Sequence, residues 1–119
     1  MIYNSELIYM AEINLGEFEQ IVLLAVVRLG NKAYGVPVRR EIEERGGRGT
    51  SVGALYSTLD RLEAKGYVHS WFADPTPLRG GRSKRYFRVT AEGLEALAHS
   101  KSVLDRMWKG LKLKGGADA

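Results

Sequence analysis

The sequence predicts a mainly helical fold with one small β-hairpin: three helices, the hairpin and a long last helix. Three observations predict it. Apolar residues recur at helical spacing in three segments between Leu15 and Lys65. Two short runs rich in aromatic and β-branched residues follow, at 68–73 and 84–90. After Thr90, apolar residues then recur every three or four positions.

Composition limits the class of protein before any motif is considered. A chain of 119 residues has room for one core, and 45% hydrophobic with 27% charged residues is ordinary for a globular protein. No apolar run approaches the roughly 18 residues that span a bilayer, and no basic-then-apolar leader is visible. The absence of cysteine removes disulfides, thiolate chemistry and most zinc sites. We therefore expect a cytoplasmic protein without a membrane partner, a cofactor or a metal.

The first helix is expected at Leu15–Leu29. Asn14 and Glu17 have the spacing of a capping box, and Gly30 with Asn31 provides a stop. The segment is apolar nearly all round, so we expect it at the centre of the core. A shorter helix is expected at Val36–Arg45.

The third helix is expected at Ser51–Lys65, with the hydroxyl of Thr50 or Ser51 as its N-cap. Its expected buried stripe consists of Val52, Leu55, Leu59 and Leu62, with Tyr56 beside it. Its opposite face consists of Gly53, Ala54, Ser57, Thr58 and Arg61. Such small, polar or basic residues allow close approach to a DNA groove. A plain solvent-exposed face is the alternative reading.

Val68–Ala73 and Lys84–Thr90 are expected to pair as a hairpin whose long tip contains Pro75, Pro77 and Gly80-Gly81. Residues 79–88 carry five bases and no acid. These bases are Arg79, Arg82, Lys84, Arg85 and Arg88. A local basic cluster is typical of proteins that bind polyanions, with solvated surface charge as the alternative.

The last helix is expected to begin after Thr90, a good N-cap. Its apolar residues, with Lys101 included, fall at alternating spacings of three and four, as in a heptad seam. The seam consists of Leu94, Leu97, Lys101, Leu104, Trp108 and Leu111. A second copy of the chain would bury it, and we expect a homodimer through Leu97, Leu104, Trp108 and Leu111. Packing on the chain's own core is the alternative, above all for Leu94 and Leu97.

Three helices followed by a hairpin are the plan of a winged helix-turn-helix, in which the third helix enters the major groove and the hairpin is the wing. The expected DNA contacts are Tyr34, Ser51, Tyr56, Ser57, Thr58 and Arg61 around the helices, and Arg82, Lys84 and Arg85 in the wing. The wing residues would neutralise phosphates, whereas the third helix would supply base readout.

Other function classes fit less well. A dimerising adaptor that binds proteins is the main alternative, although an adaptor has no need of a basic wing. RNA binding by the same surface is a second alternative. Readers of single-stranded RNA usually have exposed aromatic stacking platforms, whereas the aromatics on these strands, Trp71, Phe72, Tyr86 and Phe87, alternate in a way that suits packing of the hairpin. An enzyme is not expected, because His69 and His99 have no carboxylate at ligand spacing and no catalytic set is recognisable.

Several motifs also resemble those of the PadR family of transcriptional regulators. The matching stretches are Ala33-Tyr34-Gly35, Gly53-Ala54-Leu55-Tyr56, Arg61-Leu62-Glu63 with Gly66, and 80–87 with Val89-Thr90 and Gly93. The family usually has threonine at the position of Ala54 and proline at that of Ser57, so this chain departs from the family pattern at these two positions.

The resemblance implies a homodimeric repressor that binds a palindromic operator in double-stranded DNA, and release by a small aromatic or drug-like effector. Trp108 could line an effector pocket in the dimer, with a simple packing role as the alternative. We therefore divide the chain into an N-terminal extension (1–14, helical in one reading), a DNA-binding domain (15–90), a dimerisation helix (91–114) and a disordered tail (115–119).

Overall fold

The structure, a computed structural model, describes residues 14–73 and 83–113. Its helices are α2 (Glu17–Leu29), the 3-10 turn η1 (Gly30–Lys32), α3 (Gly35–Gly46), α4 (Val52–Ala64) and α5 (Ala91–Trp108). Its strands are β1 (Val68–Phe72) and β2 (Arg85–Val89), which pair antiparallel with Val68 opposite Val89. The mainly helical class with one hairpin is confirmed. The expectations for residues 1–13, for the hairpin tip at 74–82 and for 114–119 lie outside the described residues.

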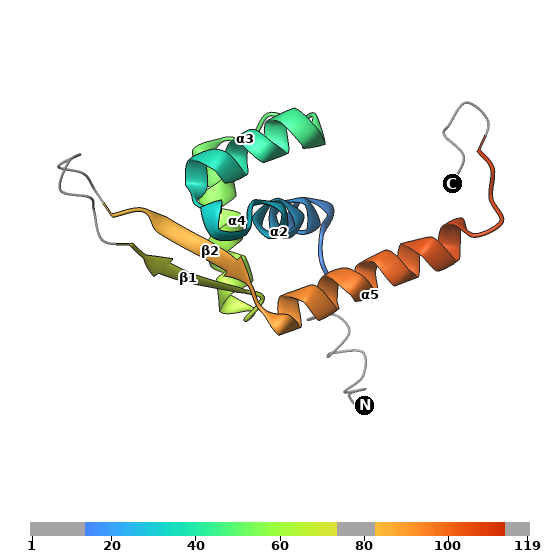
Figure 1. The fold of residues 1–119 in the computed structure, drawn as a ribbon. Helices are drawn as coiled ribbons and strands as arrows, with labels where there is room; N and C mark the ends of the chain where they lie inside the picture. The colour runs from blue at the N-terminus through green and yellow to red at the C-terminus, as the bar shows by residue number, and fades with distance from the viewer. Residues whose placement is uncertain (1–13, 74–82, 114–119) are drawn as a thin grey trace, which may run out of the picture.

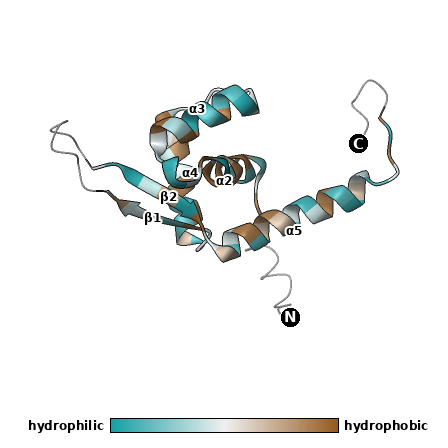
Figure 2. Cartoon of the chain, in the orientation of Figure 1, coloured by the Kyte–Doolittle hydropathy of each residue, from teal (hydrophilic) through white to brown (hydrophobic). Residues whose placement is uncertain are grey.

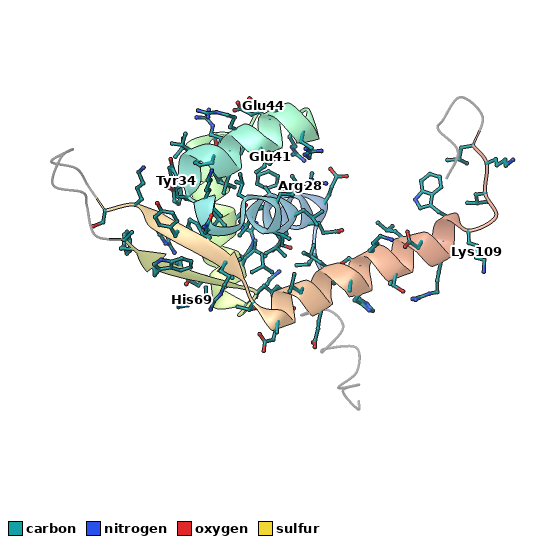
Figure 3. All side chains as sticks on the ribbon, viewed as in Figure 1. Arg28, Tyr34, Glu41, Glu44, His69 and Lys109 are labelled. Atoms are coloured by element: carbon teal, nitrogen blue, oxygen red, sulfur yellow. The ribbon has the colours of Figure 1, made fainter. Side chains whose placement is uncertain are left out.

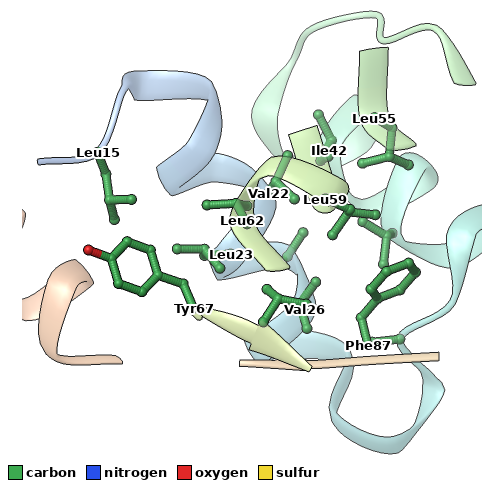
Figure 4. Packing of buried hydrophobic residues seen from close by; sticks show 14 of the residues in the cluster. Leu15, Val22, Leu23, Val26, Ile42, Leu55, Leu59, Leu62, Tyr67 and Phe87 are labelled. Carbon is green, nitrogen blue, oxygen red and sulfur yellow. The ribbon is translucent and has the colours of Figure 1, made fainter. Parts of the chain in front are cut away.

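Helices α2, α3 and α4 form a compact group, the hairpin projects from one side of it, and α5 runs away from the other (Figure 1). The core lies where α2 meets α3, α4 and β2 (Figure 4). Its largest fully buried side chains are Val22, Leu23, Val26, Val38, Ile42, Leu55, Leu59, Leu62 and Phe87. The central position predicted for the first helix is confirmed, and α2 is strongly apolar in the hydropathy view (Figure 2).

The start of α2 differs from the prediction. Its N-cap is Gly16, not Asn14, and the Gly16 N–H donates to Oε1 of Glu19 at 2.9 Å. The capping box is therefore displaced by two residues, because Leu15 is buried in the core and holds the chain extended up to Gly16.

Two residues of the third helix lie on the opposite side from the prediction. Ser51 is the N-cap, with its Oγ accepting from the Ala54 N–H at 3.0 Å, so Val52 is the first helical residue and lies half exposed at the end of the helix. Thr58 is only 3% exposed, because it follows Leu55 by three residues and therefore shares its buried face. The expectations of a buried Val52 and an exposed Thr58 were wrong.

Helix α5 begins as predicted, with Oγ1 of Thr90 accepting from the Gly93 N–H at 3.0 Å. Gly93 is buried, and a Cβ at this position would overlap the carbonyl oxygen of Tyr67, so the start of α5 lies directly against the chain before β1. Ala96 and Ser100 continue this buried face.

The far end of α5 is shorter than predicted. The helix ends at Trp108, and the next glycine, Gly110, adopts a φ of 81° that breaks helical geometry. Leu111 therefore lies beyond the helix, and the seam predicted to run through it is interrupted. None of the helices in the described part of the chain has the length and hydropathy of a membrane span.

Candidate nucleic-acid interface

The first half of α4 offers the surface expected of a groove-reading helix. Gly53, Ala54 and Ser57 are exposed, whereas Leu55 and Leu59 on the other face are buried. A Cβ on Gly53 would meet nothing within 4 Å, which shows how open this side of the helix is. Ser51 is exposed as well, but its hydroxyl oxygen already accepts the capping hydrogen bond.

Arg61 lies on α4 as expected, but its side chain turns toward α2. Its Nε lies 3.4 Å from Oε2 of Glu19, and Nζ of Lys65 lies 2.9 Å from the same oxygen. Burial of the Glu19 carboxyl by itself raises its pKa, yet hydrogen bonds from the Gly16 N–H and Lys65 outweigh it, so the net pKa is below the ordinary value. Arg61 thus compensates a buried carboxylate, a role that competes with contact to DNA.

Arg85 makes more contacts within the protein than Arg61 does. Its guanidinium lies 2.8 Å from Oε1 of Glu63 and 2.9 Å from Oδ1 of Asp60, both on α4, and donates to Oγ of Ser70 at 3.2 Å. The side chain is 22% exposed. The wing is therefore fixed to α4 through Arg85, which the sequence predicts to contact a phosphate.

This Arg85 cluster (Arg85 with Asp60, Glu63 and Ser70) shifts two pKa values. The Ser70 hydroxyl, its backbone N–H and Arg85 all donate to the Glu63 carboxylate and hold its pKa below the ordinary value, against a smaller effect of burial. Burial by itself lowers the pKa of Arg85, but its hydrogen bonds and ion pairs with Asp60 and Glu63 together have the larger effect. The net pKa is therefore above the ordinary value, and Arg85 stays charged.

The outer face of the hairpin carries a row of aromatic rings. The ring of Trp71 lies nearly parallel to those of His69 and Tyr86, at centroid distances of 5.9 and 6.0 Å, and Tyr86 contacts Tyr34 at 5.4 Å. Tyr34 is the N-cap of α3, and it and His69 are labelled beside the hairpin in Figure 3. Nζ of Lys84 lies 4.4 Å above the Tyr34 ring. Within residues 14–73 and 83–113 no carboxylate pairs with Lys84, so its charge stays available.

A cleft of about 300 Å³ separates α3 from the first half of α4. Tyr56 lines it, with a half-buried ring and a hydroxyl so close to Gly35 that a Cβ there would overlap it. Val36, Arg39 and Arg40 line it from α3. Nε of Arg39 donates to the Thr50 carbonyl at 2.7 Å and so fixes the turn before α4.

Val36, Arg39 and Arg40 were not among the site residues predicted from the sequence, and Val52, which lines the same cleft, was predicted to be buried. Because α3 is short and mostly polar, its sequence does not indicate which of its sides faces α4. The available signal in the sequence is the adjacent pair Arg39-Arg40 on an otherwise polar helix.

The residues predicted to form the seam of α5 lie in different surroundings along the chain. Leu97 packs partly against the core, whereas Leu104, Met107 and Trp108 are exposed at the far end of the helix. Leu111 is exposed beyond the helix end. No group of three or more potential metal ligands occurs in the part of the chain that the structure describes.

Comparisons with known proteins agree with this geometry. Residues 23–99 match the model of the transcriptional regulator PadR-like family. The transcriptional regulator Rv3488 of Mycobacterium tuberculosis is 34% identical over 77 residues, which cover 65% of this chain and 67% of the relative.

Among solved structures, a PadR family transcription regulator from Clostridium difficile R20291 superposes with a TM-score of 0.64 at 22% identity, covering 77% of this chain and 92% of that one. RosR of H. salinarum gives a TM-score of 0.63 at 23% identity, covering 82% and 81%. At these identities the two structures establish the shared fold, which confirms the winged helix-turn-helix plan.

Proposed function

The chain belongs to the transcriptional regulator PadR-like family, and from this premise we propose that it is a homodimeric repressor of a palindromic DNA operator. Membership makes it a DNA-binding transcriptional regulator rather than an enzyme. One observation carries the proposal further: the first half of α4 keeps one face exposed, at Gly53, Ala54 and Ser57, while Leu55 on its other face is buried in the core and the wing is fixed to α4 through Arg85. A helix and wing held in this relation suit a major groove and its adjacent backbone.

We assign the DNA contacts as follows. Ser57 and the end of α4 at Ser51 face the bases, and Tyr34 and Lys84 face a phosphate beside the wing. Tyr56 contributes its hydroxyl at the edge of the cleft, and Arg82 in the wing tip, outside the described residues, adds positive charge. We remove Thr58, Arg61 and Arg85 from the contacts, because one is buried and the other two pair with carboxylates.

A DNase footprint of the full chain on the DNA upstream of its own gene, with a promoter fusion read in parallel, tests this function. We expect two protected half-sites about one helical turn apart and lower promoter activity when the protein is present. Equal protection along the whole fragment would refute sequence-specific binding, and higher promoter activity would refute repression. A regulator of chromosomal DNA acts in the cytoplasm, where we place it.

The dimer proposal rests on the exposed apolar end of α5. Leu104 is 51% and Met107 70% exposed, and a helix that carries such residues beyond its own core needs a covering surface. We expect Leu104→Asp to shift the full chain from dimer to monomer in sedimentation velocity. Phe72→Asp is the matched control, because Phe72 is an apolar residue on the hairpin that is even more exposed, at 68%, and this change should leave the dimer intact. A dimer that tolerates Leu104→Asp would refute the assignment.

An effector pocket at Trp108 is the last part of the proposal. Trp108 is 42% exposed at the end of α5, where two copies in a dimer could line a site for a flat aromatic compound. Titration of planar compounds should change the tryptophan fluorescence of a Trp71→Phe variant and release DNA at the same concentrations. A flat response across the compounds would count against the pocket.

A further inference from the structure

The recognition helix α4 has few polar groups left to read DNA bases. Thr58 is buried, Arg61 turns to Glu19, and the Ser51 hydroxyl caps the helix. The residues that remain exposed in its first two turns are Val52, Gly53, Ala54 and Ser57. Only one of these, Ser57, has a side chain that can form a hydrogen bond.

Two valines stand out beside this helix end. Val52, the first residue of α4, is 52% exposed, and Val36 of α3 is 61% exposed. Both line the same cleft, with Tyr56 and Leu55 behind them and Arg39 and Arg40 at its side. Glu43 also lines the cleft and pairs with Arg39 at 3.4 Å, whereas Arg40 has no carboxylate partner among the described residues. The two exposed valines thus form an apolar surface at the start of α4, beside the positive charge of Arg40.

The one apolar group that a base pair presents in the major groove is the 5-methyl group of thymine. The N-terminal residues of a recognition helix are the ones that reach base edges. We propose that Val52, with Val36 beside it, selects thymine by contact with this methyl group. This rests on the proposed function, and it assigns the sequence choice to apolar contact, with Ser57 as an auxiliary hydrogen-bonding group.

Deoxyuridine, which differs from thymidine only by the missing methyl group, gives a direct test. A site is first selected from a random duplex library with the full chain, and each thymine in it is then replaced by deoxyuridine. Burial of one methyl group predicts about fourfold weaker binding at the contacted position. In Val52→Ala that ratio should fall to about one, because the partner of the methyl group is gone.

Val27→Ala is the matched control, since Val27 of α2 is also a half-exposed valine, at 46%. It should keep the full deoxyuridine penalty, and circular dichroism should show both variants folded. A penalty that persists in Val52→Ala, or no penalty at any thymine with the unaltered chain, overturns the proposal while leaving the proposed function intact. If the library yields no preferred sequence, the proposed function itself fails, and this inference with it.

Discussion

The Arg85 cluster gives the most decisive prediction, because two roles for Arg85 lead to opposite results. Arg85→Ala removes a bond of 2.8 Å to Glu63, whose side chain is 34% exposed, and one of 2.9 Å to Asp60, which is 61% exposed. A charged hydrogen bond contributes about 1.5–3 kcal/mol when buried, and exposure reduces this to about 1 kcal/mol for Glu63 and less for Asp60. The guanidinium also lies 5.0 Å from the Phe87 ring centroid, which adds about 0.5 kcal/mol.

We therefore expect Arg85→Ala to lower the free energy of unfolding by about 1–2 kcal/mol, or the Tm by about 4–8 °C. The comparison uses urea and thermal melts at one protein concentration, because a dimer gains stability with concentration. Arg88→Ala is the matched control: Arg88 is an exposed arginine on the same strand, and its loss should change stability by less than about 0.5 kcal/mol.

The DNA measurement separates the two roles. Each phosphate contact contributes about 0.9 to the slope of log K against log salt concentration. We expect Lys84→Ala to reduce that slope and Arg85→Ala to leave it unchanged wherever the variant is folded. An Arg85→Ala protein with unaltered melts and a slope reduced by about one would refute our reasoning and restore Arg85 to the phosphate contacts.

Further predictions concern pH and two glycines. Because the folded pKa of Glu63 lies below its ordinary value of 4.5, its contribution to stability is complete above that pH and is lost as the pH falls through the folded pKa. Ser70→Ala should reduce this acid-induced loss in urea melts recorded from neutral pH to about pH 3, and an unchanged pH profile would exclude Ser70 as the main cause. Gly35→Ala should cost about 1–3 kcal/mol, because the new methyl group overlaps the Tyr56 hydroxyl, and Tyr56→Phe should restore part of the loss in thermal melts. Gly93→Ala meets a backbone carbonyl that no side-chain change removes, so its loss should exceed that of Gly35→Ala, and an equal or smaller loss would show that α5 shifts freely.

The sequence was sufficient for the elements and for the core. Apolar spacing located α2, α3 and α4 to within two residues, and Thr90 marked the start of α5, because caps and periodicity are local signals. Where local signals compete, the prediction was wrong: Asn14 and Gly16 each have a glutamate three residues later, and burial of Leu15 decides between them.

The functional side chains were harder to assign, since their partners are far away in sequence. Arg61 meets Glu19 across 42 residues, and Arg85 meets Asp60 across 25, so neither pair shows in the local pattern. A basic residue in a predicted wing therefore indicates charge near DNA, but not whether that charge is already neutralised. Val52 fits the buried stripe by spacing alone, and only the position of the helix end beyond the core makes it exposed.

The ion pairs of α4 lie near its C-terminal end, whereas the exposed residues Val52 and Ser57 lie in its first half, and this has a consequence for how the protein can evolve. Arg61, Glu63 and Lys65, in its second half and just beyond its end, hold ion pairs to α2 and β2, and these pairs maintain the docking angle. Val52 and Ser57, in its first half, contribute little to that arrangement. If Val52 and Ser57 read bases as we propose, substitutions at these exposed positions change the preferred DNA sequence at small cost to folding, so that duplicated copies of the gene acquire new targets one substitution at a time.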